Sequence, residues 1–513
     1  MNSKDFWLLA TAIFLLSAVR VASTYRVFAP VVDEPTHISA GRMWWAGVPA
    51  WEALNPPLAK ILFAIPYLSQ APEHPEDRAF MPAMLLFNRP DAVSALARAR
   101  MANLLFLGVA IFAIAAWARE LGDAVAIVAV VLFACVPQVL GNAGLAGTDM
   151  AAAATLTLAL FATDRWLRSG TWTAATLAGL AAGAGALAKL SFPLFFPLGA
   201  IVLLICERKR RTAKASQITV FALAAVIVLW AGYRFELKPL ASFQSVIMPA
   251  ASALSPPLRW LYTRVPIPAT SYVGGLFMLR RYTEIGTLSY LFGHTTHHGW
   301  WYYFPVVFFF KTPLPFLVFA GAGVARVPLK FALIPAAVML SALNSTIEIG
   351  VRHLLPLYPF LAIAAAAGLV CLWRQRRKAW RAAALVLAAW FIIGSAAAHP
   401  DYFAWFNEAA GPEPQRIAVD SNLDWGQDMF RLARLTRKRN FDQIALRCTT
   451  TIPFDHFGVH DTPLPPFAIT KGWVAVSETI LALDPDARRG GFEWLSGLPY
   501  ERVGQSIRLY YVP

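Results

Sequence analysis

The stretch "FWLLATAIFLLSAVRVASTYRVFAPVVDEPTHISAG" (residues 6–41) joins an apolar segment to two adjacent carboxylates. Its first part, Phe6 to Tyr25, has Arg20 as its one charged residue and the length of about 20 residues that crosses a bilayer core. A cleavable signal peptide is the alternative, because the apolar run before Arg20 is short and small residues follow it. Under both interpretations Asp33 and Glu34 are expected just outside the membrane.

The composition predicts a polytopic membrane protein. Of 513 residues, 58% are hydrophobic and only 15% are charged, which is too little charge for a soluble domain of this size. Three of the four cysteines lie in apolar runs, so no disulfide framework is predicted. The net charge of +15 does not indicate a nucleic-acid partner, because the densest basic clusters lie between apolar segments, as membrane topology requires.

The apolar segments number about eleven, each of roughly 17–25 residues, and after the first they begin near Ala102, Ala124, Met150, Ala174, Phe192, Ile218, Trp301, Phe331, Leu354 and Ala382. The basic loops "ERKRRTAK" (207–214) and "RQRRKAWR" (374–381) fall on one face, which the positive-inside rule makes cytoplasmic together with the N-terminus. We therefore expect a transmembrane domain over residues 1–400, with exterior loops at 26–100 and 238–299.

The C-terminal part, residues 401–513, has a different pattern and is predicted to be a small exterior α/β domain of about 110 residues. "RIAVDSNLDWGQDMFRLARL" (416–435) is typical of a strand, a loop and a helix. "FDQIALRC", "GWVAVSE" and "VGQSIRLYYV" predict three further strands.

Several of these stretches, in this order, resemble the C-type glycosyltransferase superfamily, and in particular family 39-like bacterial members related to protein O-mannosyltransferases and the lipid A aminoarabinose transferase. They are "DEPTHISAG", "NPPLAK", "TDM" (148–150), "WWYYFPVVFFFKTPLP", "GVRHLLPLYPFLA" and "DSNLDWGQD", and they extend from Asp33 to Asp428. The resemblance implies an enzyme of the membrane, most simply the bacterial inner membrane. It would transfer a hexose or pentose from a polyprenyl-phosphate carrier to a protein, lipid or glycan acceptor at the exterior face, with inversion.

Sugar transfer to a hydroxyl needs a general base, and a carboxylate at the membrane boundary suits that role. The family's acidic motif implies Asp33 as the base, with Glu34 orienting the acceptor or the base. Helix capping remains the alternative for Asp33, since an acidic residue before Pro35 commonly begins a helix.

The departing phosphate requires cations at the exterior ends of spans. The residues predicted to bind it are Arg98, Arg100, Lys189, Lys311, Arg352 and His353. Ionisable residues at membrane depth are functional candidates, because burying them unpaired is costly. Arg98 and Arg100 have an alternative role, with side chains that extend to lipid headgroups.

A third group of polar residues is predicted to contact acceptor or sugar: His37, Asn55, Lys60, Asp149, Asp420, Asn422 and Asp424. Asp149 has two alternatives, pairing with one of the cations or capping its helix. The loop at Asp420 resembles the start of a calcium loop, but Trp425 replaces the glycine of the sharp turn. No cofactor is predicted with certainty.

A divalent metal is a weaker alternative. His294, His297 and His298 in "HTTHH" have helical spacing for two imidazole ligands, and the aminoarabinose transferase is a relative associated with zinc. No Cys or carboxylate is adjacent to them, and histidines before a span also occur at the headgroups.

Two other classes of function stay open at this point. A transporter or flippase of a lipid-linked substrate would also be polytopic with basic residues at depth, although no internal repeat of the kind such proteins show is visible. An assembly subunit without activity is the other.

Overall fold

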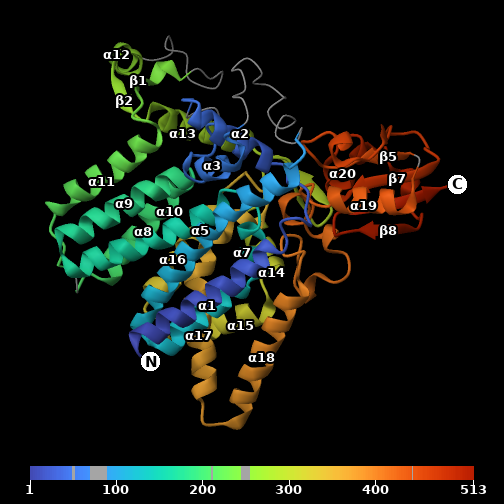
Figure 1. Ribbon diagram of the computed structural model, residues 1–513. Helices are drawn as coiled ribbons and strands as arrows, with labels where there is room; N and C mark the ends of the chain where they lie inside the picture. The colour runs from blue at the N-terminus through green and yellow to red at the C-terminus, as the bar shows by residue number, and fades with distance from the viewer. Residues whose placement is uncertain (49–51, 70–88, 210–211, 244–254, 442) are drawn as a thin grey trace.

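The structure is a computed structural model, and it describes residues 1–48, 52–69, 89–209, 212–243, 255–441 and 443–513. Parts of both predicted exterior loops and of the basic loop 207–214 lie outside these residues. A bundle of long helices occupies one side of the molecule, and a small sheet with its own helices lies beside it (Figure 1).

The helices of the bundle and of the segments around it follow one another along the chain as α1 (Ser3–Ala22), α2 (Glu34–Trp45), α3 (Leu58–Phe63), α5 (Ala92–Ala118), α6 (Asp123–Cys135), α7 (Pro137–Ala143), α8 (Asp149–Ser169), α9 (Trp172–Ala188), α10 (Phe192–Cys206), α11 (Gln217–Gly232), α12 (Pro256–Arg264), α13 (Thr270–Ile285), α14 (Tyr303–Lys311), α15 (Leu314–Val324), α16 (Lys330–Ala342), the 3₁₀ helix η6 (Val351–Leu357), α17 (Tyr358–Arg374) and α18 (Lys378–Ala397). Two short hairpins lie among them: β1 (Leu237–Pro239) with β2 (Pro266–Pro268), and β3 (Ser289–Leu291) with β4 (His294–Thr296).

Four described segments are long and apolar enough to cross a bilayer singly: α1, residues 92–121, residues 351–374 and α18. Two bent pairs pass the same test together, α6 with α7 at 65° and α14 with α15 at 113°. Helices α9, α10, α11 and α16 are apolar but shorter. The chain is therefore a polytopic helical membrane protein, and the count of eleven spans stays a prediction.

Close helix packing in the bundle depends on small residues. A Cβ at Gly179 or Gly183 of α9 would lie 2.3 Å from Phe221 O or 2.6 Å from Ala225 O of α11. A Cβ at Gly323 of α15 would lie 1.7 Å from a backbone oxygen of α17. Small residues spaced in this way let helix backbones approach closely where lipid offers no hydrophobic driving force.

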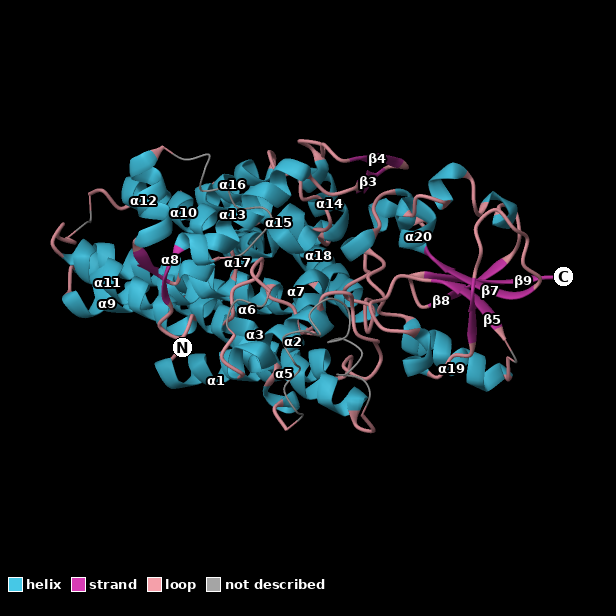
Figure 2. Ribbon diagram, turned by 90° about the horizontal axis from the view of Figure 1, so that it is seen from above, coloured by secondary structure: helices cyan, strands magenta, loops and turns pink. Residues whose placement is uncertain are grey.

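The C-terminal part contains η9 (Asp420–Asn422), α19 (Met429–Arg439), α20 (Glu478–Leu483) and the strands β5 (Ile444–Arg447), β6 (Asp461–Pro463), β7 (Gly472–Ser477), β8 (Tyr500–Val503) and β9 (Ile507–Val512). The strand order is β6-β5-β7-β9-β8, with β5 parallel to both neighbours and the other pairs antiparallel. Figure 2 shows α19 and α20 on opposite sides of this sheet. Apolar side chains of both sheet faces form two separate cores.

The strand predicted at "RIAV" is wrong. Asp420, which follows it, has a φ of +54°, and its N–H donates to Thr479 Oγ1 at 3.0 Å instead of joining a strand. Ile417 and Ala418 pack into the core of the helical bundle. This segment consequently links the sheet to the bundle and places Asp420 near the ends of the helices.

Candidate active site

Four charged side chains meet where several helices begin or end, and we call them the Asp33 cluster: Asp33, Asp149, Lys189 and Arg352. Asp33 directly precedes α2, Asp149 begins α8, Lys189 follows α9, and Arg352 lies in η6. Arg352 Nη1 lies 2.8 Å from Asp33 Oδ2 and 3.6 Å from Asp149 Oδ2, and Lys189 Nζ forms an ion pair with Asp149. The cluster brings together residues separated by up to 319 positions in the chain.

The members of the Asp33 cluster differ in their access to solvent. The side chain of Asp33 is 33% exposed, whereas those of Arg352 and Asp149 are 9% and 3% exposed. A molecule that approaches the cluster therefore meets the Asp33 carboxylate as its most exposed side chain.

The Arg352 guanidinium is held from several sides. It lies 4.1 Å from the ring centroid of Trp425, which stacks on Phe403, and the neighbouring Val351 N–H donates to Asn422 at 2.9 Å. A guanidinium has five N–H donors. Its Nε is buried and has no partner among the described residues, so Arg352 keeps donor capacity for an anionic group.

The charges of the Asp33 cluster also affect the pKa of two further side chains, Asp420 and Tyr282. Burial raises the pKa of Asp420 to about 6, and the nearby Arg352 guanidinium opposes that rise. Burial, together with the charges of Asp420 and Asp33, raises the pKa of Tyr282 on α13. Neither Tyr282 nor Trp425 was predicted as a site residue from the sequence. Trp425 lies inside the motif "DSNLDWGQD", which was predicted to belong to the site, whereas Tyr282 lies in none of the motifs.

Asp33 does not cap α2. Its backbone is already helical, with φ −83° and ψ −23°, and its side chain makes no capping hydrogen bond. The carboxylate turns to Arg352 instead. The capping alternative for this residue is therefore wrong.

Glu34 and Arg100 require a correction. Both side chains are 0% exposed and form a two-bonded ion pair, with Arg100 Nη2 2.7 Å from Glu34 Oε2 and Nε 2.8 Å from Oε1. Arg100 also donates to three backbone carbonyls of residues 25–29, and Glu34 accepts from the N–H of Ala146 at 2.7 Å. Glu34 therefore does not face an acceptor and Arg100 has no donor left for a phosphate; the pair fixes the loop before Asp33 against the loop before Asp149.

Glu34→Gln should destabilise the protein, because it leaves the Arg100 charge buried without its partner. Losing one member of a buried ion pair costs about 3–5 kcal/mol of unfolding free energy. Thermal unfolding of the detergent-purified protein measures this loss. Arg98→Ala is the matched control, since Arg98 is 50% exposed and pairs with Asp91 at the surface. Equal melting temperatures for the two variants would contradict this assignment.

Two other predicted phosphate ligands do not reach the cluster. Lys311 is 0% exposed, donates to Phe403 O at 2.9 Å and to Asn422 O, and lies 4.1 Å from the ring centroid of Phe406. It joins the helices to the C-terminal part. Arg98 is occupied with Asp91. His353 remains a candidate, because its Nε2 is buried without a partner in the described part of the chain.

Of the residues predicted to bind acceptor or sugar, some bond to other parts of the protein and some lie near Arg352. Lys60 donates to Glu52 at 3.0 Å, His37 Nδ1 contacts Ala146 O at 3.0 Å, and Asn55 Oδ1 accepts from Thr148 at 3.2 Å. The contacts of His37 and Asn55 support the loop before Asp149, whereas Lys60 binds Glu52 in the segment that precedes α3. Two further members bond within the interior: Asn422 with Tyr303 and Val351, and Asp424 with Thr479 and Thr449. Of this predicted group, Asp149 pairs with Arg352 at 3.6 Å, and the charge of Asp420 interacts with that of Arg352.

The predicted histidine pair does not fit a metal. His294 begins strand β4, and His297 and His298 follow the strand, so their spacing is not helical as predicted. Among the described residues, no group of three or more His, Cys, Asp or Glu side chains is placed to hold a metal ion.

Residues 92–233 match the family model described as dolichyl-phosphate-mannose-protein mannosyltransferase. A comparison with curated proteins finds no match. The fold is similar to the crystal structure of ArnT from Cupriavidus metallidurans bound to undecaprenyl phosphate, with a TM-score of 0.50, 14% identity, and coverage of 99% of this chain and 98% of that one. The apo form of that protein gives a TM-score of 0.49 at 14% identity, covering 99% and 98% of the two chains.

The Archaeoglobus fulgidus oligosaccharyltransferase gives a TM-score of 0.48 at 13% identity, covering 84% of this chain and 58% of that one. The matched family model falls on α5 to α11, which carry Asp149 and Lys189 of the cluster. Residues 92–233 therefore resemble the dolichyl-phosphate-mannose-protein mannosyltransferase family, and the fold of the chain resembles that of ArnT, in agreement with the resemblance predicted from the motifs.

Proposed function

We propose that the protein is a membrane glycosyltransferase that moves a sugar from a polyprenyl-phosphate donor to an acceptor hydroxyl at the Asp33 cluster. The observation that carries this proposal is the partly exposed Asp33 carboxylate, held 2.8 Å from a buried guanidinium that keeps free donors. The description of the matching family and the undecaprenyl phosphate bound to ArnT support it.

In the proposed reaction Asp33 takes the proton of the acceptor hydroxyl as its oxygen attacks the anomeric carbon. The bond between that carbon and the phosphate oxygen breaks, and its electron pair stays on the phosphate. Because the attack comes from the side opposite the leaving phosphate, the anomeric configuration inverts.

Arg352 and Lys189 would neutralise the charge that develops on the leaving phosphate. Preorganised cations lower the barrier most when they meet charge that is formed in the transition state. Asp149 contacts both of them in the free protein and thus keeps them near each other. When a phosphate binds Arg352, it replaces Asp33 as that residue's partner and leaves the carboxylate available to the acceptor.

We place the cluster at the exterior face of the bacterial inner membrane, opposite the basic loops 207–214 and 374–381. On this proposal residues 1–400 form the catalytic membrane domain, with its N-terminus cytoplasmic, and residues 401–513 form an exterior domain. Trp425 and Asp420 belong to the C-terminal part but adjoin Arg352, so both parts build one site.

A labelled donor distinguishes this function from that of a transporter or flippase. Purified protein in detergent micelles, which have no compartments, is incubated with a radiolabelled polyprenyl-phosphate sugar and with protein, lipid and glycan extracts in turn as acceptor. A transferase converts the label into a new glycoside and releases polyprenyl phosphate. Unchanged donor in every extract, from protein that still binds polyprenyl phosphate, would favour transport instead.

A further inference from the structure

The C-terminal sheet contains a cavity of about 480 Å³ that is separate from the Asp33 cluster. It lies at the start of β5 and β7, and Gly472 of β7 pairs with Val512 next to the C-terminus. Figure 1 and Figure 2 place the C-terminus at the end of the sheet that points away from the helical bundle. This volume is within the range of small-molecule sites, about 300–1,000 Å³.

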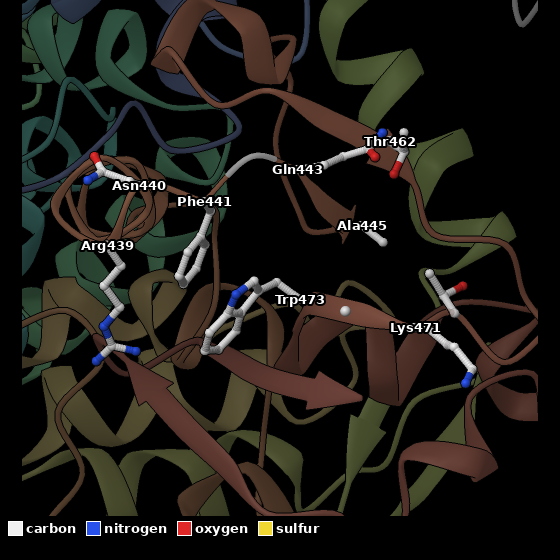
Figure 3. Close-up of a pocket in the computed structure, with 10 residues that line it drawn as sticks. Arg439, Asn440, Phe441, Gln443, Ala445, Thr462, Lys471 and Trp473 are labelled. Carbon is white, nitrogen blue, oxygen red and sulfur yellow. The ribbon is translucent and has the colours of Figure 1, made fainter. Parts of the chain in front are cut away.

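Aromatic and polar side chains face each other across this cavity. Phe441 and Trp473 stack with ring centroids 4.2 Å apart and form one wall. Figure 3 shows Gln443 and Thr462 together on another side, and Lys471 apart from them on the chain that leads to Trp473. An apolar wall facing hydrogen-bonding groups can hold a ligand that has both an apolar surface and many polar atoms.

The polar groups of the cavity are not used by the protein itself. Within the described part of the chain, the side chains of Asn440, Gln443, Thr462 and Lys471 make no hydrogen bond or ion pair. Arg439 differs, since its guanidinium is bound at 2.7 and 3.0 Å by the carboxylate of Glu501. Amides and hydroxyls both donate and accept, whereas Lys471 is the one uncommitted charge that the described lining offers.

From these observations we propose that this cavity is a carbohydrate-binding site. Sugar hydroxyls both donate and accept, as Gln443 and Thr462 do, and the C–H face of a sugar ring packs against an aromatic wall. A purely apolar ligand would cover the exposed amides of Asn440 and Gln443 without bonding to them, and a polyanion would meet only one uncommitted cation among the described lining residues. The site takes a neutral or singly charged glycan.

The test measures binding to the full chain in detergent, without donor lipid, so that its outcome is independent of the transfer reaction. The probes are disaccharides of glucose, mannose, galactose and N-acetylglucosamine. Their binding is measured by saturation-transfer NMR and titration calorimetry. At least one probe should bind, and Gln443→Ala combined with Lys471→Ala should weaken it about tenfold or more, as the loss of two ligand hydrogen bonds requires.

Lys438→Ala is the matched control, because this exposed residue of α19 lies outside the cavity. It should leave the dissociation constant unchanged. The melting temperatures of all variants are compared, and the single substitutions replace the double one if it lowers the melting temperature. Binding of no probe, or binding that both cavity substitutions leave intact, would overturn the proposal.

Discussion

Asp33→Asn should nearly abolish sugar transfer, with kcat lowered about 10²–10⁴-fold, the contribution typical of a general base. An amide cannot take the proton of the acceptor hydroxyl. Its carbonyl oxygen can still accept the hydrogen bond of Arg352, so the donor site should keep its geometry and KM for the donor should change little. Initial rates against donor concentration measure both parameters.

The control for this substitution is Asp91→Asn, at a surface carboxylate that also pairs with arginine. That variant should transfer sugar at the wild-type rate. Because Asp149 still pairs with Arg352 and Asp33 makes no capping bond, Asp33→Asn should unfold at nearly the wild-type temperature. Substantial activity in Asp33→Asn would remove Asp33 as the base and make Asp420 the next carboxylate to test.

Arg352→Ala should lower kcat about 10²–10³-fold, the effect of removing one preorganised electrostatic donor. The guanidinium meets a charge that grows as the sugar–phosphate bond breaks, so its loss affects the transition state more than the bound donor. Arg352→Lys should recover only part of the rate, since an ammonium keeps the charge but loses the planar fork of donors and its stacking on Trp425.

Arg98→Ala is the matched control, because Arg98 is a surface arginine held by Asp91. Its kinetics should equal those of the wild type. A donor KM raised in Arg352→Ala with kcat intact would instead assign Arg352 to ground-state binding. Unchanged kinetics would exclude Arg352 from the phosphate site, and Lys189 and His353 would become the next candidates.

Residue type and position along a span pointed to Arg352, Lys189 and Asp149, and the family resemblance added Asp33. The structure brings these four residues into one cluster. They were not enough for Arg100 and Lys311. A buried cation has the same sequence pattern whether it awaits a ligand or is already bound. Arg100 binds Glu34, 66 positions away in the chain, and backbone carbonyls such as that of Tyr25, 75 positions away. No rule of helix or strand spacing predicts contacts between residues so far apart in sequence.

The C-terminal part shows the same limit. Short apolar runs predicted β7 and β9, and in the structure both strands place apolar side chains in the cores on the two faces of the sheet. "RIAV" has a similar pattern, but its apolar side chains pack on the helical bundle instead of in a sheet. Tyr282 could not be predicted because only the fold brings it within the influence of the charges of Asp33, Asp420 and Arg352.

The central claim is that a sugar is transferred from a lipid phosphate, with inversion, at the Asp33 cluster. A single-turnover reaction with an anomerically pure, ¹³C-labelled donor tests it most directly. NMR follows the anomeric carbon while released polyprenyl phosphate is counted. The account predicts one lipid phosphate released for each glycoside formed, a product of inverted configuration, and product formation about 10²–10⁴-fold slower in folded Asp33→Asn protein. A product that retains the donor's configuration, or one formed equally well by Asp33→Asn, would contradict it.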